Sequence, residues 1–190
     1  MRPTAPGTAV SGATNEARGW LRGALSGLRV FASVGALALA IGLAEYAASG
    51  GAYRLLTWMK VGALYLVSFF GVGVRVDVGG AELFLLRLPL LTGTALAGWL
   101  LFRAGRSSSG DRSGWRAAGI VAGFVVPVWA VALPARLLFP DLGGPGVDAT
   151  VYAIGWQVLL LPAVFATAAV AVGVWSARTP RSRSAAVARR

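Results

Sequence analysis

Long apolar runs separated by short polar stretches dominate the pattern of this chain. Four of these runs contain between 19 and 26 residues each. As helices rising about 1.5 Å per residue they would be about 28 to 39 Å long, enough to cross a hydrocarbon core of about 30 Å. The pattern therefore predicts an all-α integral membrane protein with four transmembrane helices, at residues 30–48, 83–102, 117–139 and 150–175.

The residues in front of the first run divide into two parts. Residues 1–16 are rich in Thr, Ala, Gly and Pro, a composition that predicts a disordered tail. In residues 17–29, Trp, Leu and Ala recur at helical spacing, while Arg18, Arg22 and Arg29 lie towards another side. This pattern predicts a short amphipathic helix whose basic face lies on an anionic membrane surface.

Two series of glycines are spaced four residues apart. Gly19, Gly23 and Gly27 occupy the amphipathic segment, and Gly119 and Gly123 begin the third run. Such spacing allows two helix backbones to approach closely. Because the chain has 26 glycines and glycine lowers helix propensity, we interpret the first series as compositional.

A shorter apolar segment, residues 55–74, lies between the first two long runs. Lys60 interrupts it and leaves 14 uncharged residues, 61–74. A helix of about 21 Å is too short to span and is typical of a re-entrant or interfacial segment. If the segment does cross, the protein has five transmembrane helices instead of four.

A β-hairpin is predicted directly after this segment. Residues 74–78 alternate strictly between apolar and charged side chains, which is a strand pattern. Gly79 and Gly80 follow, and paired glycines suit a tight turn into a second strand at 81–84. A hairpin has unpaired backbone groups at its edges, so it must lie outside the membrane or be covered by helices.

The basic residues predict the orientation. The loop at residues 103–116 carries four Arg and residues 178–190 carry five, whereas residues 140–149 carry none. Cytoplasmic loops are enriched in Arg and Lys, so both termini are expected in the cytoplasm of a bacterial cell with the protein in its plasma membrane. Residues 17–177 then form one transmembrane domain, and 178–190 form a disordered basic tail.

A few polar residues are expected at or just inside the outer membrane surface. Ionisable groups at membrane depth are candidates for a functional site. Glu45 and Arg87 end and begin neighbouring predicted helices, so we expect them to form an ion pair; the alternative is that each extends separately into the headgroups. The candidate cluster consists of Glu45, Lys60, Arg87, Arg136 and Gln157.

The composition argues against an enzyme. The chain has no Cys and no His, which removes thiol nucleophiles, imidazole acid–base chemistry and the usual zinc ligands. Its motifs include neither a phosphate-binding loop nor a nucleophile elbow, so we predict no catalytic activity, cofactor or metal. The net charge of +11 lies at the ends of apolar runs, where membrane topology explains it better than nucleic-acid binding.

The stretch from Tyr53 to Arg106 contains VSFFGVGVRVDVGG, then LRLPLLTGTALAGWLLF, and ends in Arg-Ala-Gly-Arg. It resembles a module of the actinobacterial PerM-like cell-division membrane proteins and covers under a third of the chain. The resemblance implies an accessory protein of the cell envelope or division machinery and brings no catalytic residues.

Two functions remain open at this point. Helices rich in small residues and basic flexible ends suit an accessory or scaffold protein that binds other membrane proteins. The alternative is a small transporter that acts as an oligomer, with the polar cluster beside the short segment as its site. The expected partners are the lipid bilayer, anionic inner-leaflet lipids, and other membrane proteins or further copies of the chain.

Overall fold

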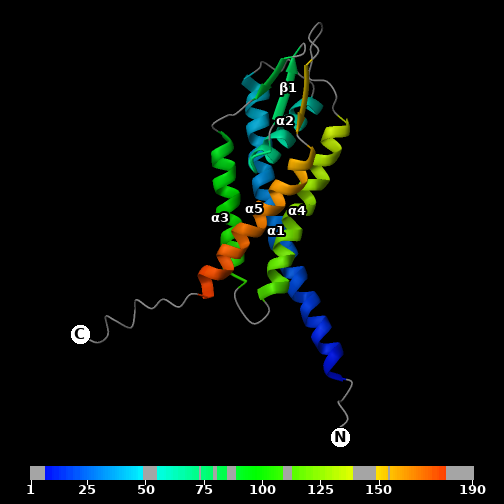
Figure 1. The fold of residues 1–190 in the computed structure, drawn as a ribbon, viewed down its shortest axis with the longest axis vertical. Coiled ribbons are helices and arrows are strands. Elements are labelled where there is room, and N and C mark those ends of the chain that lie inside the picture. Colours follow the sequence, from blue (N-terminus) through cyan, green and yellow to red (C-terminus); the bar gives the residue numbers. More distant parts are fainter. Residues whose placement is uncertain are drawn as a thin grey trace, which may run out of the picture.

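A computed structural model describes residues 7–48, 55–72, 74–78, 81–84, 89–108, 113–138, 149–153 and 155–178. These residues form five helices and three strands (Figure 1). In chain order the elements are α1 (Gly7–Ala48), α2 (Leu55–Ser68), β1 (Val74–Val78), β2 (Ala81–Phe84), α3 (Pro89–Arg106), α4 (Ser113–Leu138), β3 (Ala149–Ala153) and α5 (Gly155–Arg178).

Four long helices, α1, α3, α4 and α5, form a bundle with the small sheet at one end (Figure 1). Helix α1 begins and α5 ends at the opposite end. Within the described residues, three helical segments are long and apolar enough to cross a membrane: Thr14–Ala44, Gly114–Leu133 and Gly155–Arg178. This is the character of a membrane protein. Helix α3 is not one of the three, although its 18 residues extend over about 27 Å beside α5.

Helix α1 is one continuous element of 42 residues, about 63 Å long. The sequence predicted a disordered tail up to residue 16 and a border between two helices at residue 29. Both predictions are wrong for the described part, residues 7–48. The physical reason is that the chain has no proline between Pro6 and Pro89, so nothing interrupts the backbone hydrogen bonds, and α4 packs along the glycines of α1.

Glycines on both helices bring α1 and α4 into backbone contact. At four glycines, an added Cβ would overlap a backbone carbonyl oxygen of the facing helix. The compositional interpretation of the glycine series is therefore wrong for Gly23 and Gly27, while Gly19 has nothing within 4 Å. The contacting pairs are Gly23 with Arg116, Gly27 with Ile120, Gly119 with Trp20 and Gly123 with Ala24.

Glycines also bring α3 and α5 into backbone contact. An added Cβ at Gly173 would overlap the carbonyl oxygen of Phe102, and one at Gly105 would lie 2.5 Å from that of Val170. Large apolar side chains fill the remaining space inside the bundle, among them Val34, Leu101, Ile120, Phe124 and Val128, each fully buried.

The sheet has the order β2-β1-β3, and both pairings are antiparallel. In β1, Asp77 lies opposite Glu82 of β2 and opposite Thr150 of β3. The connecting Gly79 and Gly80 lie outside the described residues.

The third strand corrects the predicted start of the last span at residue 150. Residues 149–153 pair with β1, and α5 begins at Gly155. The apolar run concealed the change, since Thr, Val and Tyr suit a strand as well as a buried helix. The predicted two-stranded hairpin is therefore part of a three-stranded sheet beside the helical bundle.

The start of the second predicted span also differs. It was expected at residue 83, but residues 81–84 belong to β2 and α3 begins at Pro89. Proline favours the first position of a helix, because its fixed φ suits the turn and its missing N–H removes no hydrogen bond there. Helix α3 in turn continues to Arg106, one turn beyond the predicted end at 102.

Candidate functional site

The five polar residues predicted as a cluster are only partly covered by the structure. Gln157 is half-buried in the first turn of α5. Glu45, Lys60 and Arg136 lie on α1, α2 and α4, but their side chains are outside what the structure describes, as is the whole of Arg87. The cluster, including the ion pair between Glu45 and Arg87, stays a prediction.

The chain reverses direction where α2 ends. The N–H of Phe69 donates to the carbonyl of Tyr65 at 3.1 Å, and that of Gly71 to the carbonyl of Ser68 at 3.0 Å. Gly71 has φ of +77°, a conformation that side chains with a Cβ rarely adopt. The chain then enters β1, so α2 and the sheet lie at the same end of the bundle (Figure 1).

Residues of α3 contact the turn that follows α2. The hydroxyl of Thr94 donates to the carbonyl of Phe69 at 2.5 Å, and the neighbouring Gly93 lies directly against the Phe69 ring. Ser68 donates to the carbonyl of Leu64 at 2.8 Å. Irregular backbone inside a membrane protein must find hydrogen-bond partners within the protein. These bonds provide them, so the end of α2 is a packed element.

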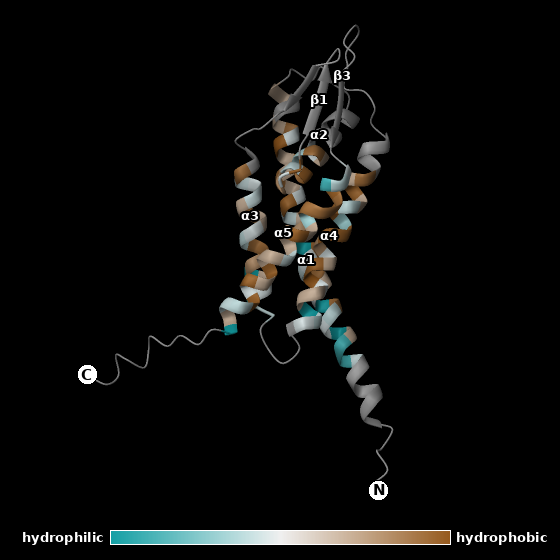
Figure 2. Ribbon diagram, in the orientation of Figure 1, coloured by the Kyte–Doolittle hydropathy of each residue, from teal (hydrophilic) through white to brown (hydrophobic). Residues whose placement is uncertain are grey.

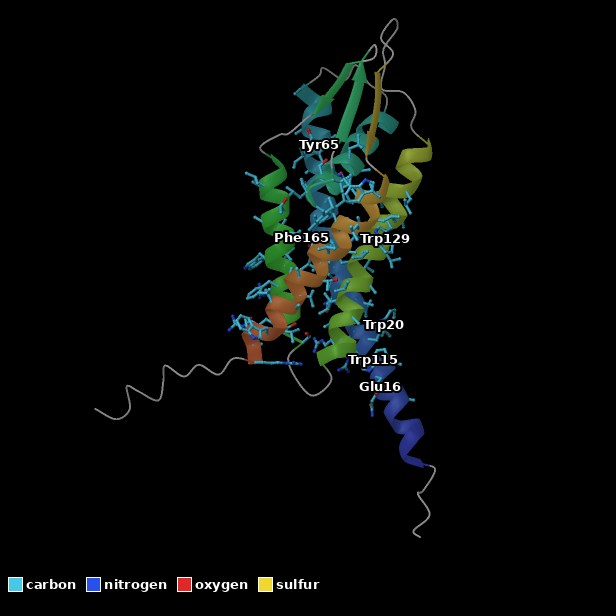
Figure 3. The ribbon with its side chains drawn as sticks, viewed as in Figure 1. Glu16, Trp20, Tyr65, Trp115, Trp129 and Phe165 are labelled. Atoms are coloured by element: carbon cyan, nitrogen blue, oxygen red, sulfur yellow. The ribbon has the colours of Figure 1, made fainter. Side chains whose placement is uncertain are left out.

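An aromatic cluster lies beneath this turn. The Phe70 ring packs against Phe124 and Phe165, with both centroid distances 5.4 Å. Phe124 and Phe165 come from near the middle of α4 and α5, and Figure 3 labels Phe165 between the two ends of the bundle. We name Phe69, Phe70, Phe124 and Phe165 the aromatic plug, because they fill the space below α2.

An open groove follows α4 and α5 on another side of the bundle. It has a volume of about 670 Å³ and its walls are mainly alanine, glycine and valine. Each wall contains three small residues spaced four apart, so that each set lies along one helix face. They are Gly114, Ala118 and Ala122 on α4 and Ala163, Thr167 and Ala171 on α5; we name this the α4–α5 groove.

Polar side chains mark the two ends of the α4–α5 groove. Near the sheet, the indole N–H of Trp129 donates to the carbonyl of Leu159 at 3.2 Å and links the two helices (Figure 3). At the other end lie Trp175, which is 67% exposed, and Arg178. Thr167 donates to the carbonyl of Ala163 in its own helix, so the wall between the two ends presents mostly apolar surface.

Arginines gather at the end of the bundle opposite the sheet, where hydrophilic residues are concentrated in Figure 2. Trp20 and Trp115 lie near the same end and are 42% and 54% exposed (Figure 3). Glu16 is the only acidic residue whose side chain the structure describes. Among the described residues, the basic end therefore carries a net positive charge, from Arg18, Arg22, Arg103, Arg106, Arg116 and Arg178.

Sequence reasoning missed the α4–α5 groove. The four-residue spacing of its small residues is visible in the sequence, but so are many similar spacings in a chain this rich in Ala and Gly. Which of them face an open side depends on which helices are neighbours, and no local pattern encodes that.

No protein-family model, curated protein or solved structure matches this chain. The resemblance of residues 53–106 to PerM-like proteins therefore stays a prediction. The function of the chain has to be inferred from the geometry of its site.

Proposed function

We propose that the protein is a multi-pass membrane accessory protein that binds a transmembrane helix of another membrane protein in the α4–α5 groove. The groove itself carries this proposal. It is open, apolar and lined on both sides by small residues, whereas the contacts of α1 with α4 and of α3 with α5 are tightly packed.

The groove suits a helix for the same reason that α1 suits α4. Lipid chains are as apolar as the side chains, so helices associate in membranes through close packing, and small residues permit the closest approach. From Gly114 to Trp129 the groove follows 15 residue steps of α4, about 22 Å. That length accommodates about four turns of a partner helix.

The proposal includes a topology. The basic end lies in the cytoplasm, α1, α3, α4 and α5 cross the bacterial plasma membrane, and α2 enters and leaves on the outer side. The arginines and the exposed Trp20 and Trp115 at one end support this orientation, because Arg marks cytoplasmic ends and Trp marks interfaces. Both termini are then cytoplasmic.

The topology has a direct test. Reporters that are active only outside the cell are fused at Pro145 and after Arg190, and single cysteines are placed at Arg54 and Gly79. We expect activity from the first fusion alone, and labelling of both cysteines by an impermeant thiol reagent in intact cells. Activity after Arg190, or labelling of only one cysteine, contradicts the proposed topology.

The setting in the cell envelope or division machinery rests on the resemblance of residues 53–106 alone. It names the class of partner to look for first: another multi-pass or single-pass envelope protein that crosses the same membrane.

Site-specific photocrosslinking in cells tests the groove. A photoreactive residue replaces Ala171 in the groove, and in a matched strain it replaces Leu91, which is 70% exposed on α3. We expect Ala171 to yield a discrete adduct with a protein that has a transmembrane helix, and Leu91 to yield none. The additional substitution Ala122→Leu should remove the adduct by filling the groove.

Two other outcomes have defined meanings. Adducts with lipid only, unchanged by Ala122→Leu, would falsify helix binding. Adducts with a second copy of the chain, and no other protein, favour the alternative of a small transporter that acts as an oligomer.

A further inference from the structure

A second hollow, of about 420 Å³, lies on α3 at its last two turns. It is on a different helix from the α4–α5 groove, so an inference from it does not depend on the proposed partner helix. The residues that line it are spaced three, four and seven positions apart, which places them on one helix face. They are Trp99, Phe102, Arg103, Arg106 and Ser107.

This face of α3 points away from the bundle. The opposite face is buried, with Ala97 and Leu101 fully inaccessible and Gly105 against α5. Trp99 is 54% exposed, and both arginines are exposed. A ligand can therefore reach the hollow from the surrounding lipid without any movement of the helices.

An aromatic ring holds one of the two arginines in place. The guanidinium of Arg103 lies over the indole of Trp99, 5.4 Å from the ring centroid. This cation–π contact favours a position of the guanidinium beside the ring, while its N–H groups remain able to donate. Arg106 lies one turn further along, so two cationic forks border the same hollow.

The hollow is layered along the helix. Trp99 and Phe102 lie towards the middle of the bundle, and Arg103, Arg106 and Ser107 lie towards the basic end. A phospholipid at the inner membrane surface has the same order, with its chains inward and its phosphate outward.

We propose that this hollow binds the phosphate headgroup of an anionic phospholipid of the inner leaflet. Arg103 and Arg106 contact the phosphate oxygens, since guanidiniums bind phosphate with two parallel hydrogen bonds. The first acyl carbons lie along Trp99. The competing explanation is that the two arginines only complement the dipole at the end of α3, which needs no ligand.

Native mass spectrometry of the full chain in detergent tests this site. Phosphatidylglycerol is the probe, phosphatidylcholine is the neutral comparison, and glycerol phosphate is the soluble headgroup. We expect one phosphatidylglycerol per chain to bind at least about tenfold more tightly than phosphatidylcholine. Both lipids have an anionic phosphate, but the cationic choline of phosphatidylcholine is repelled by the two arginines, whereas glycerol is uncharged.

The variants separate a site from general surface charge. Arg103→Gln should weaken phosphatidylglycerol binding about tenfold, and Arg106→Gln about fivefold. Arg18→Gln removes the same charge from an exposed position on α1 and should leave binding within about twofold. Unfolding temperatures without lipid should match in all four proteins, and phosphatidylglycerol should raise them more in wild type and Arg18→Gln than in the other two variants.

Equal losses in Arg103→Gln and Arg18→Gln would overturn the proposal in favour of non-specific attraction. Equal affinity for both lipids would show that the two arginines do not select an anionic headgroup and would overturn the proposal. Displacement of the lipid by millimolar glycerol phosphate would identify a soluble phosphate ester as the ligand and also overturn the lipid assignment.

Discussion

The two sides of α4 carry similar small residues but meet different surroundings. On one side, Gly119 and Gly123 touch the backbone of α1 at Trp20 and Ala24. On the other side, Gly114, Ala118 and Ala122 face the α4–α5 groove of about 670 Å³. The first side is a closed contact between two helices, and the second has similarly small residues along an open groove.

This difference predicts two uses for the small residues of α4. In a contact that is already made they determine how closely two helices pack, and their replacement disturbs the fold. On an open face they contribute little to the fold, and their replacement affects what binds there. Substitutions on the two sides of α4 should therefore differ in their effect on stability, most of all at the contact with α1.

The largest effect is expected at the α1–α4 contact. Gly23→Val and Gly27→Val together place side chains where the backbone of α4 lies, so the helices must separate. We expect the free energy of unfolding to fall by about 4 kcal/mol, because each of the two overpacked sites costs about 1 to 3 kcal/mol. Thermal unfolding in detergent measures it. Gly19→Val is the matched control, since Gly19 has open space, and it should be neutral or slightly stabilising.

The aromatic plug should give the next largest effect. Phe124 is fully buried on α4 and meets the Phe70 ring edge-on. Phe124→Ala leaves a cavity under α2. We expect the free energy of unfolding, measured by thermal unfolding in detergent, to fall by about 3 kcal/mol. Leu133→Ala on the same helix removes a side chain that is 40% exposed and should cost less than about 1 kcal/mol. Equal losses for the two variants would mean that the plug does not support α4.

A smaller effect is expected from one hydrogen bond. Thr94→Val removes the donor to the carbonyl of Phe69 and leaves that carbonyl inside the bundle without this partner. We expect the free energy of unfolding to fall by about 1 kcal/mol. This value lies between the average for hydrogen bonds between membrane helices and that for buried hydrogen bonds in soluble proteins. Thr167→Val is the control on the groove wall, because Thr167 is exposed and bonds within its own helix. A loss there as large as that of Thr94→Val would contradict the distinction between closed and open faces.

The sequence predicted the parts of the fold that depend on length and polarity. The apolar run at 117–139 corresponds to α4 at Ser113–Leu138, because only a helix of that length lets an apolar run cross a bilayer. The short run at 55–74 corresponds to a 14-residue α2 that ends in a reversal. The pairing of 74–78 with 81–84 follows the alternation and the two glycines between them.

The remaining features depend on neighbours that no local pattern identifies. Thr150 and Tyr152 read as the start of a helix, and only the unpaired edge of β1 makes them a strand. Gly23 reads as one glycine among 26, and only the position of Arg116 gives it a role. The α4–α5 groove is the extreme case, because it exists only where α4 and α5 lie beside each other.

The smallest change in stability is expected in that groove. Ala122→Leu adds a large side chain to a half-buried position that faces open space, so it need not displace backbone or core side chains. We expect the free energy of unfolding in detergent to change by less than about 0.5 kcal/mol, as for other surface substitutions. Partner binding, measured as co-purification in mild detergent, should nevertheless fall about tenfold, because the leucine occupies the space that a partner helix needs at its closest approach.

Ala130→Leu is the matched control: the same change on the same helix, at an exposed position outside the groove. If Ala130→Leu and Ala122→Leu reduce co-purification equally, the partner does not bind in the groove. If Ala122→Leu instead destabilises the bundle as much as the paired valines in α1 do, the two sides of α4 are both structural contacts, and the open face has no separate role in binding.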